Sequence, residues 1–106
     1  MIKVSVFKDS GQYRGFRSEG HAGYAEEGYD IICSAVSVLA VNAVNSIEAF
    51  TDDEMDVTAD DGLIELRLGD FVSDAAKLLL DSFVLGIQGI CDSYGNEYIE
   101  LVFEEV

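Results

Sequence analysis

The sequence predicts an α+β domain in which both helices pack on a mostly antiparallel sheet. Two observations predict it. The residue pattern runs strand, strand, helix twice and closes with a further strand, and both helical segments are long and apolar enough to cover a sheet. A length of 106 residues with no proline fits one compact domain over 1–106. We expect this domain to hold its core without disulfide or metal staples.

The first strand-strand-helix unit occupies the first half of the chain. Apolar and polar residues alternate over 2–8 and again over about 13–19, with a turn at 9–12 between them. Residues 22–29 follow neither a strand nor a helix period and contain two glycines, which indicates a loop. A helix is expected from about 30 to 50. It is apolar on nearly all sides, so we expect the sheet to cover one face and a second helix or a second subunit to cover another.

The second unit repeats this order with a different sequence. Strands are predicted at 55–59 and 63–68, joined by a tight turn that contains an Asp-Gly pair. Apolar residues at helical spacing predict a helix over about 71–91, and alternation at 99–103 predicts the closing strand.

The charge of the chain is strongly negative. There are 21 acidic against 6 basic residues, a net charge of −15, which argues against nucleic acid as a partner. The acidity serves solubility alone or favours a basic protein partner. Met1 leads directly into an alternating strand, and the apolar stretch 31–47 is interrupted by Ser and Asn. We therefore expect no signal peptide, no membrane span and a cytoplasmic location.

Two residues form a candidate catalytic pair. Cys33 falls in the first turn of the helix expected from Asp30, where unpaired N–H groups and the helix dipole favour the thiolate. His21, the only histidine, ends a strand and opens the loop, so it can act as a proton partner. The backbone amides of Cys33 and Ser34 could bind an oxyanion. A buried structural cysteine and a simple loop histidine are the alternatives.

Other residues near this pair have possible supporting roles. Asp30 is placed to cap the helix or to orient the His21 ring. Ser37 lies one turn after Cys33 on the same helix face. The second cysteine, Cys91, has no histidine or motif near it and is expected to be structural. Neither cysteine has metal-ligand spacing, so we expect no metal and no cofactor.

The segment 20–37 is similar to the signature of the ribosomal-processing cysteine proteases, the Prp family. The resemblance is carried by Gly-His-Ala at 20–22 and Gly-Tyr-Asp-Ile-Ile-Cys at 28–33, at this separation. Length and element order agree over the whole chain. Ser34 is a departure, since the family often has alanine after the cysteine.

The resemblance implies a catalytic dyad of His21 and Cys33, with Asp30, Ser37 and Gly20 in support. It implies an endopeptidase that removes a short N-terminal extension from the large-subunit ribosomal protein whose tail reaches the peptidyl-transferase centre, cleaving after an aromatic-rich motif. The substrate would be basic and the enzyme a homodimer. The loop would then be a lid that orders on the substrate. Its candidate residues are Gly23, Tyr24, Gly28 and Tyr29.

Two other functions remain open. The same acidic fold could be a non-catalytic ribosome-assembly factor that binds a basic ribosomal protein, with Cys33 merely buried. Alternatively, Cys33 could sense oxidants by forming a sulfenic acid or a mixed disulfide. Of the three functions, the protease alone requires His21 as acid and base.

Overall fold

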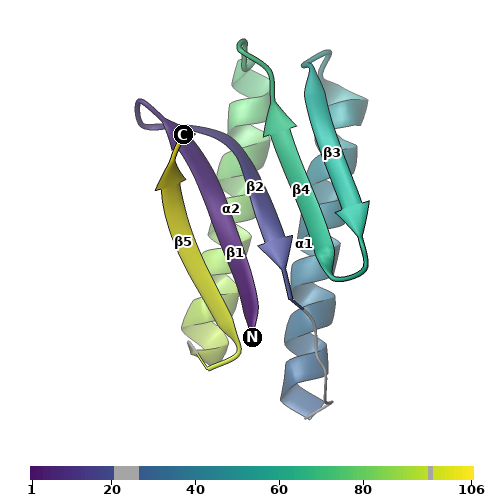
Figure 1. Cartoon of the computed structure of the whole chain (residues 1–106), viewed down its shortest axis with the longest axis vertical. Coiled ribbons are helices and arrows are strands. Elements are labelled where there is room, and N and C mark those ends of the chain that lie inside the picture. The colour runs from purple at the N-terminus through teal and green to yellow at the C-terminus, as the bar shows by residue number, and fades with distance from the viewer. Residues whose placement is uncertain (21–26, 96) are drawn as a thin grey trace.

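The computed structural model describes residues 1–20, 27–95 and 97–106, with 27–30 described by their backbone alone. Within these residues, five strands and two helices follow one another in the predicted order (Figure 1). Their bounds are β1 Ile2–Asp9, β2 Gln12–Glu19, α1 Glu27–Phe50, β3 Met55–Asp60, β4 Leu63–Leu68, α2 Asp74–Tyr94 and β5 Ile99–Glu105. The predicted strand-strand-helix repeat with a closing strand is confirmed.

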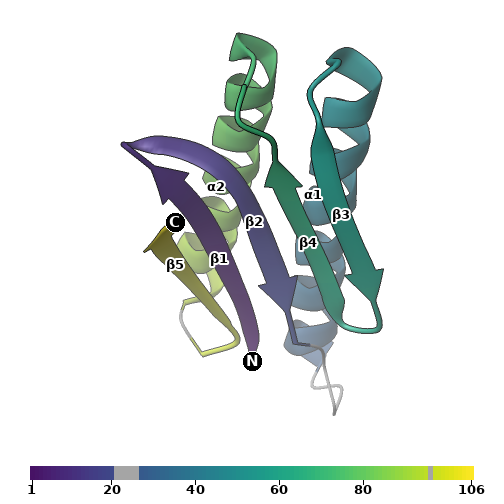
Figure 2. The ribbon, with the colours of Figure 1, turned by 45° about the horizontal axis from the view of Figure 1, so that its top comes forward.

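The strands form one sheet in the order β3-β4-β2-β1-β5. Every neighbouring pair is antiparallel except β1 and β5, which run parallel. Both helices lie on the same face of this sheet, and they run in opposite directions (Figures 1 and 2). The structure is therefore the predicted α+β fold, with two layers and one sheet face left free of helices.

The core lies between the sheet and the inner sides of the two helices. Ile2, Val4 and Val6 alternate along β1 and are fully buried, as the period of two along a strand requires. The ring of Phe83 on α2 stacks on Phe16 of β2, with ring centroids 4.0 Å apart. On α1 the buried positions recur every three or four residues and are Ile32, Val36, Ala40, Ala43 and Ile47.

The second helix begins at Asp74, three residues later than predicted. The cause is a helix cap, because the Ser73 hydroxyl accepts a hydrogen bond of 3.1 Å from the backbone N–H of Ala76. Phe71 therefore precedes the helix, and its side chain is exposed. Farther along, α2 approaches α1 closely at Gly86, where an added Cβ would lie 2.9 Å from Cδ1 of Leu39.

The first helix carries more apolar residues than packing on one side requires. Its segment Ile31–Phe50 is long and apolar enough to cross a membrane by length and composition alone, with a mean hydropathy of 1.6. One stripe packs into the core, as in the central helix of a globular domain. The opposite stripe exposes Ile31, Val38 and Val41. The sheet and α2 thus cover one side of α1, and the other side stays exposed in the single chain.

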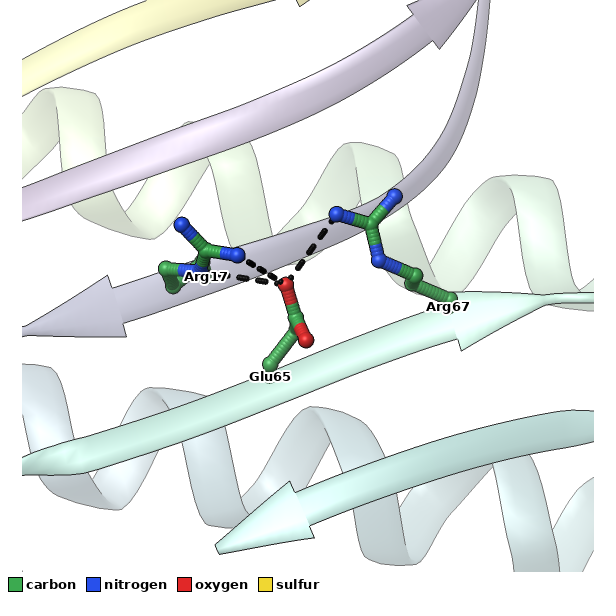
Figure 3. Close-up of polar contacts among 3 residues, drawn as sticks. All are labelled: Arg17, Glu65 and Arg67. Carbon is green, nitrogen blue, oxygen red and sulfur yellow. Dashed lines mark hydrogen bonds and ion pairs between the residues drawn. The ribbon is translucent and has the colours of Figure 1, made fainter. Parts of the chain in front are cut away.

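The helix-free face of the sheet carries a small ionic cluster (Figure 3). Oε1 of Glu65 accepts hydrogen bonds from Nη2 of Arg17 at 2.7 Å and from Nη2 of Arg67 at 3.2 Å. Burial raises the pKa of the Glu65 carboxyl, but Arg17 and then Arg67 lower it by more, so this pKa lies below its usual value. The Arg67 guanidinium also lies over the Phe7 ring, 4.2 Å from its centroid. The cluster ties β2 to β4 away from the helices.

Candidate functional site

A cleft of about 310 Å³ opens where α1, the end of β2 and the β3–β4 turn meet. Cys33 and Ser37 line it from α1 and Gly20 from the end of β2, while Asp60 and Asp61 line it from the end of β3 and the turn after it. Figure 1 shows that these three segments lie at the same end of the molecule. The cleft therefore brings together two parts of the predicted site, Cys33 and the residue that precedes His21.

Gly20 holds this junction in a conformation that glycine favours. Its φ is +103°, and an added Cβ would lie 2.5 Å from the carbonyl oxygen of Met1. Its backbone N–H donates a hydrogen bond of 3.0 Å to the carbonyl oxygen of Gly62 in the β3–β4 turn. Because three backbone segments converge at one residue without a side chain, Gly20 fixes where the chain leaves the sheet toward His21. The supporting role of Gly20 in catalysis stays a prediction.

Cys33 lies deeper in its helix than predicted. The helix begins at Glu27, so the expected start at Asp30 is wrong, and Cys33 is in the second turn. Asp30 lies inside the helix and is not its N-cap. The physical reason is that Glu27 and Asp30 are acidic residue types, which the positive end of a helix favours in its first turn. The apolar period that begins with Ile31 did not reveal this earlier turn.

The new helix start removes the argument for an oxyanion site at the Cys33 and Ser34 amides. An α-helix leaves its first four N–H groups without an intrahelical acceptor, and these two amides lie beyond them in a helix that starts at Glu27. The effect of the macrodipole also falls off within the first turn. Ser34 is exposed to solvent. The helix end therefore gives no separate support to Cys33 as the predicted nucleophile.

Three of the predicted site residues lie outside the described residues: His21, Gly23 and Tyr24. Gly28 and Tyr29, which were expected in the loop, belong to α1 by their backbone. The predicted loop over 22–29 is thus too long at its C-terminal side. Contact between the His21 imidazole and the Cys33 thiol stays a prediction.

The position of Ser37 agrees with the spacing argument. It lies one helical turn after Cys33, and both side chains line the cleft. Cys33 is half-buried and packs against the edge of the core, whereas Ser37 is exposed. Cys33 thus packs on the core and also lines the cleft.

The acidic turn of the second hairpin is a part of the site that the sequence analysis missed. Asp60 and Asp61 line the cleft, and none of the described residues that line it is basic. These residues reach Cys33 because Glu19 of β2 pairs with Leu63 of β4, which brings the turn beside Gly20. The order of strands in a sheet leaves no local signal in the sequence. The Asp-Gly pair predicted the turn, but it did not predict that the turn lies beside Gly20.

The second cysteine has a different environment. Cys91 lies in the last turn of α2, half-buried, and its carbonyl oxygen accepts the capping hydrogen bond of Gly95 at 2.8 Å. Burial, and then the charge of Asp92, raise the pKa of the Cys91 thiol. Both effects disfavour the thiolate, which supports the structural role expected of this residue.

No group of three or more His, Cys, Asp or Glu side chains among the described residues is arranged to hold a metal ion. The described residues that line the cleft offer a thiol, two serine hydroxyls and two carboxylates.

Comparison with known proteins gives one answer along the whole chain. The family described as "Cysteine protease Prp" matches residues 1–100. The ribosomal processing cysteine protease Prp of Staphylococcus aureus is 33% identical over 107 residues, which cover 98% of this chain and 100% of that protein. A solved structure of the S. aureus protease with a substrate peptide has a TM-score of 0.88 at 32% identity. Another, with a covalently linked product peptide, has a TM-score of 0.86 at 33% identity. Each of the two structures covers 98% of this chain and is itself covered completely.

Proposed function

The chain belongs to the Prp family of cysteine proteases, and we therefore propose that it is an endopeptidase with Cys33 as nucleophile and His21 as proton partner. The observation that carries the proposal is that Cys33 lines the same cleft as Gly20, the residue directly before His21. A half-buried thiol that lines an open cleft suits attack on a bound peptide.

The reaction consists of two steps. The Cys33 thiolate forms a C–S bond with the scissile carbonyl carbon, the C–N bond breaks, and His21 gives its proton to the departing amine. Water then attacks the thioester while His21 accepts the proton, and this releases the carboxylic acid and restores the thiolate. The covalently linked product peptide in the S. aureus structure supports a covalent route in this family.

The proposed substrate is a large-subunit ribosomal protein with a short N-terminal extension, cleaved after an aromatic-rich motif. The names of the relatives support a ribosomal substrate. A basic substrate protein suits a cleft that carries Asp60 and Asp61 on a chain of net charge −15. Tyr24 and Tyr29 are candidates to stack on the aromatic residues of the motif. Nucleic acid is not expected to bind.

We also propose a cytoplasmic homodimer formed through the outer side of α1. Val38 is 67% exposed there, beside Ile31 and Val41. A hollow of about 380 Å³ on this side is lined by uncharged residues, which suits contact with a second copy. Ser37 lines both this hollow and the Cys33 cleft, so the dimer contact would border the site.

The direct test is to incubate the protein with the extended ribosomal protein and to measure the products by mass spectrometry. We expect two products, and a loss of at least about a hundredfold in kcat for His21→Ala, because general acid-base catalysis is removed. A wild-type protein that binds the substrate without cleaving it would support the assembly-factor alternative. Oxidation of Cys33 that proceeds equally in His21→Ala, with no cleavage in either protein, would support the redox sensor.

A further inference from the structure

A second hollow, larger than the Cys33 cleft, lies at the opposite end of the molecule. It measures about 680 Å³ and is formed by the α1–β3 and β4–α2 connections, including the segments 50–54 and 69–71. In Figures 1 and 2 these two connections lie side by side, away from the β3–β4 turn. The proposed chemistry at Cys33 makes no use of this hollow.

Two phenylalanines line the hollow and are exposed to solvent. The side chains of Phe50 and Phe71 are 74% and 75% exposed, although the domain has a well-formed core. Phe71 stays outside because the Ser73 cap starts α2 after it. Exposed aromatic side chains that line one hollow, as these two do, are typical of a contact surface, since they supply binding energy once a partner covers them.

The frame that carries these rings is well connected by hydrogen bonds. The Asp53 carboxylate accepts a hydrogen bond of 2.8 Å from the Ser73 backbone N–H, and the Gly69 N–H donates one of 2.9 Å to the Glu54 carbonyl oxygen. The Arg14 guanidinium donates to the Gly69 and Asp70 carbonyl oxygens. Because both connections are held to each other and to β2, little ordering is required when a partner binds.

The charge of the hollow indicates what kind of partner fits. Four carboxylates line it, from Asp52, Asp53, Glu54 and Asp70, and none of the described lining residues is basic. Burial raises the pKa of the Asp53 carboxyl, but hydrogen bonds from Ser73 and then Thr51 lower it by more, so it stays ionised at neutral pH. Arg14 offsets part of this charge at one rim. A second copy of the chain would bring like charges together, whereas a cationic segment would be attracted.

The distance from the cleft suits one substrate that reaches both places. Cys33 and Phe50 lie on the same helix, and at a rise of 1.5 Å per residue they are about 25 Å apart along its axis. An extended chain of about eight residues covers that distance. A protein whose N-terminal extension is in the cleft can therefore place a segment beyond the cleavage point at the hollow.

From these observations we propose that the hollow between Phe50 and Phe71 is an exosite for a lysine- or arginine-rich segment of the substrate protein. This inference rests on the proposed function, because it takes the cleaved ribosomal protein as the occupant. An apolar residue of the segment lies between the two rings, and its cationic neighbours face the four carboxylates. Docking there holds the substrate, while the bond is cut about 25 Å away.

The test compares Phe50→Ala/Phe71→Ala with a control, Leu78→Ala/Leu85→Ala. Leu78 and Leu85 are 68% and 70% exposed on α2 and do not line the hollow. Each protein cleaves both the full extended ribosomal protein and a short peptide that contains the cleavage motif alone. For Phe50→Ala/Phe71→Ala we expect KM to rise about tenfold on the full protein with kcat unchanged, and no change on the peptide. The control should change neither value.

Three outcomes would overturn the exosite. They are equal losses on both substrates, no loss on either, and a change from dimer to monomer in Phe50→Ala/Phe71→Ala, which would make the hollow an interface between copies.

Failure of the proposed function is distinguishable from failure of the exosite, because the wild-type protein would then cleave neither substrate. In that case the exosite is tested by binding alone, through the Kd of each protein for the mature ribosomal protein, which lacks the extension. The exosite requires about tenfold weaker binding by the phenylalanine variant, and equal binding contradicts it.

A charge variant tests the electrostatic part separately. Asp52→Asn/Asp70→Asn removes two exposed carboxylates and leaves Asp53, which accepts from Ser73, in place. We expect weaker binding of the mature ribosomal protein and a smaller dependence of its Kd on salt. An unchanged salt dependence would contradict a cationic occupant.

Discussion

Cys33 and Cys91 are both half-buried, and both lie near the end of the molecule where α1 starts and α2 ends (Figure 1). Cys33 faces a cleft that it shares with Ser37 and Gly20. Cys91 lies in the last turn of its helix, where burial and Asp92 raise the pKa of its thiol. The two residues have the same chemistry and a similar degree of exposure, so their difference comes from what surrounds them.

This difference lies in the surroundings of each thiol. Exposure does not separate the two residues, and neither does membership of a helix. Cys33 differs from Cys91 by the open cleft that it lines. Cys91 differs from Cys33 by a thiol pKa that burial and then Asp92 raise. The following experiments attempt to break or sharpen this contrast, in order of decreasing expected effect.

The largest effect is expected from exchanging each thiol for a hydroxyl. Cys33→Ser should lower kcat/KM for the extended substrate by about a thousandfold or more, because an alcohol in this cleft is not ionised. Cys91→Ser should stay within about twofold of the wild type. Steady-state cleavage assays measure both values. Comparable losses in the two variants would mean that the contrast between the cysteines is not catalytic.

The second effect concerns the junction that leads to His21. Gly20→Ala forces a side chain into a backbone with φ of +103° and against the Met1 carbonyl oxygen. We expect a loss of about 1–3 kcal/mol in the free energy of unfolding and a fall of about tenfold in kcat/KM. Gly89→Ala is the matched control, since an added Cβ there has no atom within 4 Å, and it should stabilise the helix slightly. Denaturant titration with parallel cleavage assays measures both variants. Wild-type activity in Gly20→Ala would show that the junction does not position the site.

The third effect is on alkylation. Because the pKa of the Cys91 thiol is raised, its thiolate fraction at neutral pH is lower than that of an ordinary cysteine. Its reaction with iodoacetamide should be slow at pH 7 and accelerate toward pH 9 and above. Peptide mapping of partially labelled protein should find several-fold more label on Cys33 than on Cys91 at pH 7. Preferential labelling of Cys91 would reverse the contrast.

The smallest effect lies outside both cysteine environments. The pKa of Glu65 is lowered in the folded state, so its stabilisation is complete above its unfolded pKa of about 4.3 and is lost as the pH falls through the folded value. Glu65→Gln should cost about 1 kcal/mol or less at pH 7, since Arg17 and Arg67 are partly exposed. The difference from wild type should shrink below about pH 4 in thermal unfolding. Labelling of both cysteines should not change.

Local patterns predicted the elements well and their ends less well. Alternation in β1 and β5 and the Asp-Gly turn placed the strands correctly, because each signal lies within a few residues. Both helix starts were wrong, in opposite directions. The period of apolar residues included Phe71 although Ser73 caps the helix after it, and it did not include the acidic first turn from Glu27.

The cleft agrees with one part of the sequence analysis and adds residues that it missed, while the catalytic role of Cys33 stays a prediction. The motif in 20–37 predicted that Cys33 lies near the end of β2, and the structure places Cys33 and Gly20 in one cleft. Asp60 and Asp61 reach that cleft through the pairing of β2 with β4, which joins residues more than forty positions apart. The exposed Phe50 and Phe71 have the same origin, because two connections distant in sequence meet at the far end. Such contacts depend on strand order, which has no local signature.

The central claim is that Cys33 forms the covalent bond to the substrate. The most direct measurement is to treat the wild-type protein with a peptide of the cleavage motif that ends in a thiol-reactive electrophile, and then to determine the intact mass and the modified residue. We predict one peptide per chain, attached to Cys33, no adduct in Cys33→Ser, and an unchanged adduct in Cys91→Ser. An adduct on Cys91, or one that forms equally well in Cys33→Ser, would contradict the account.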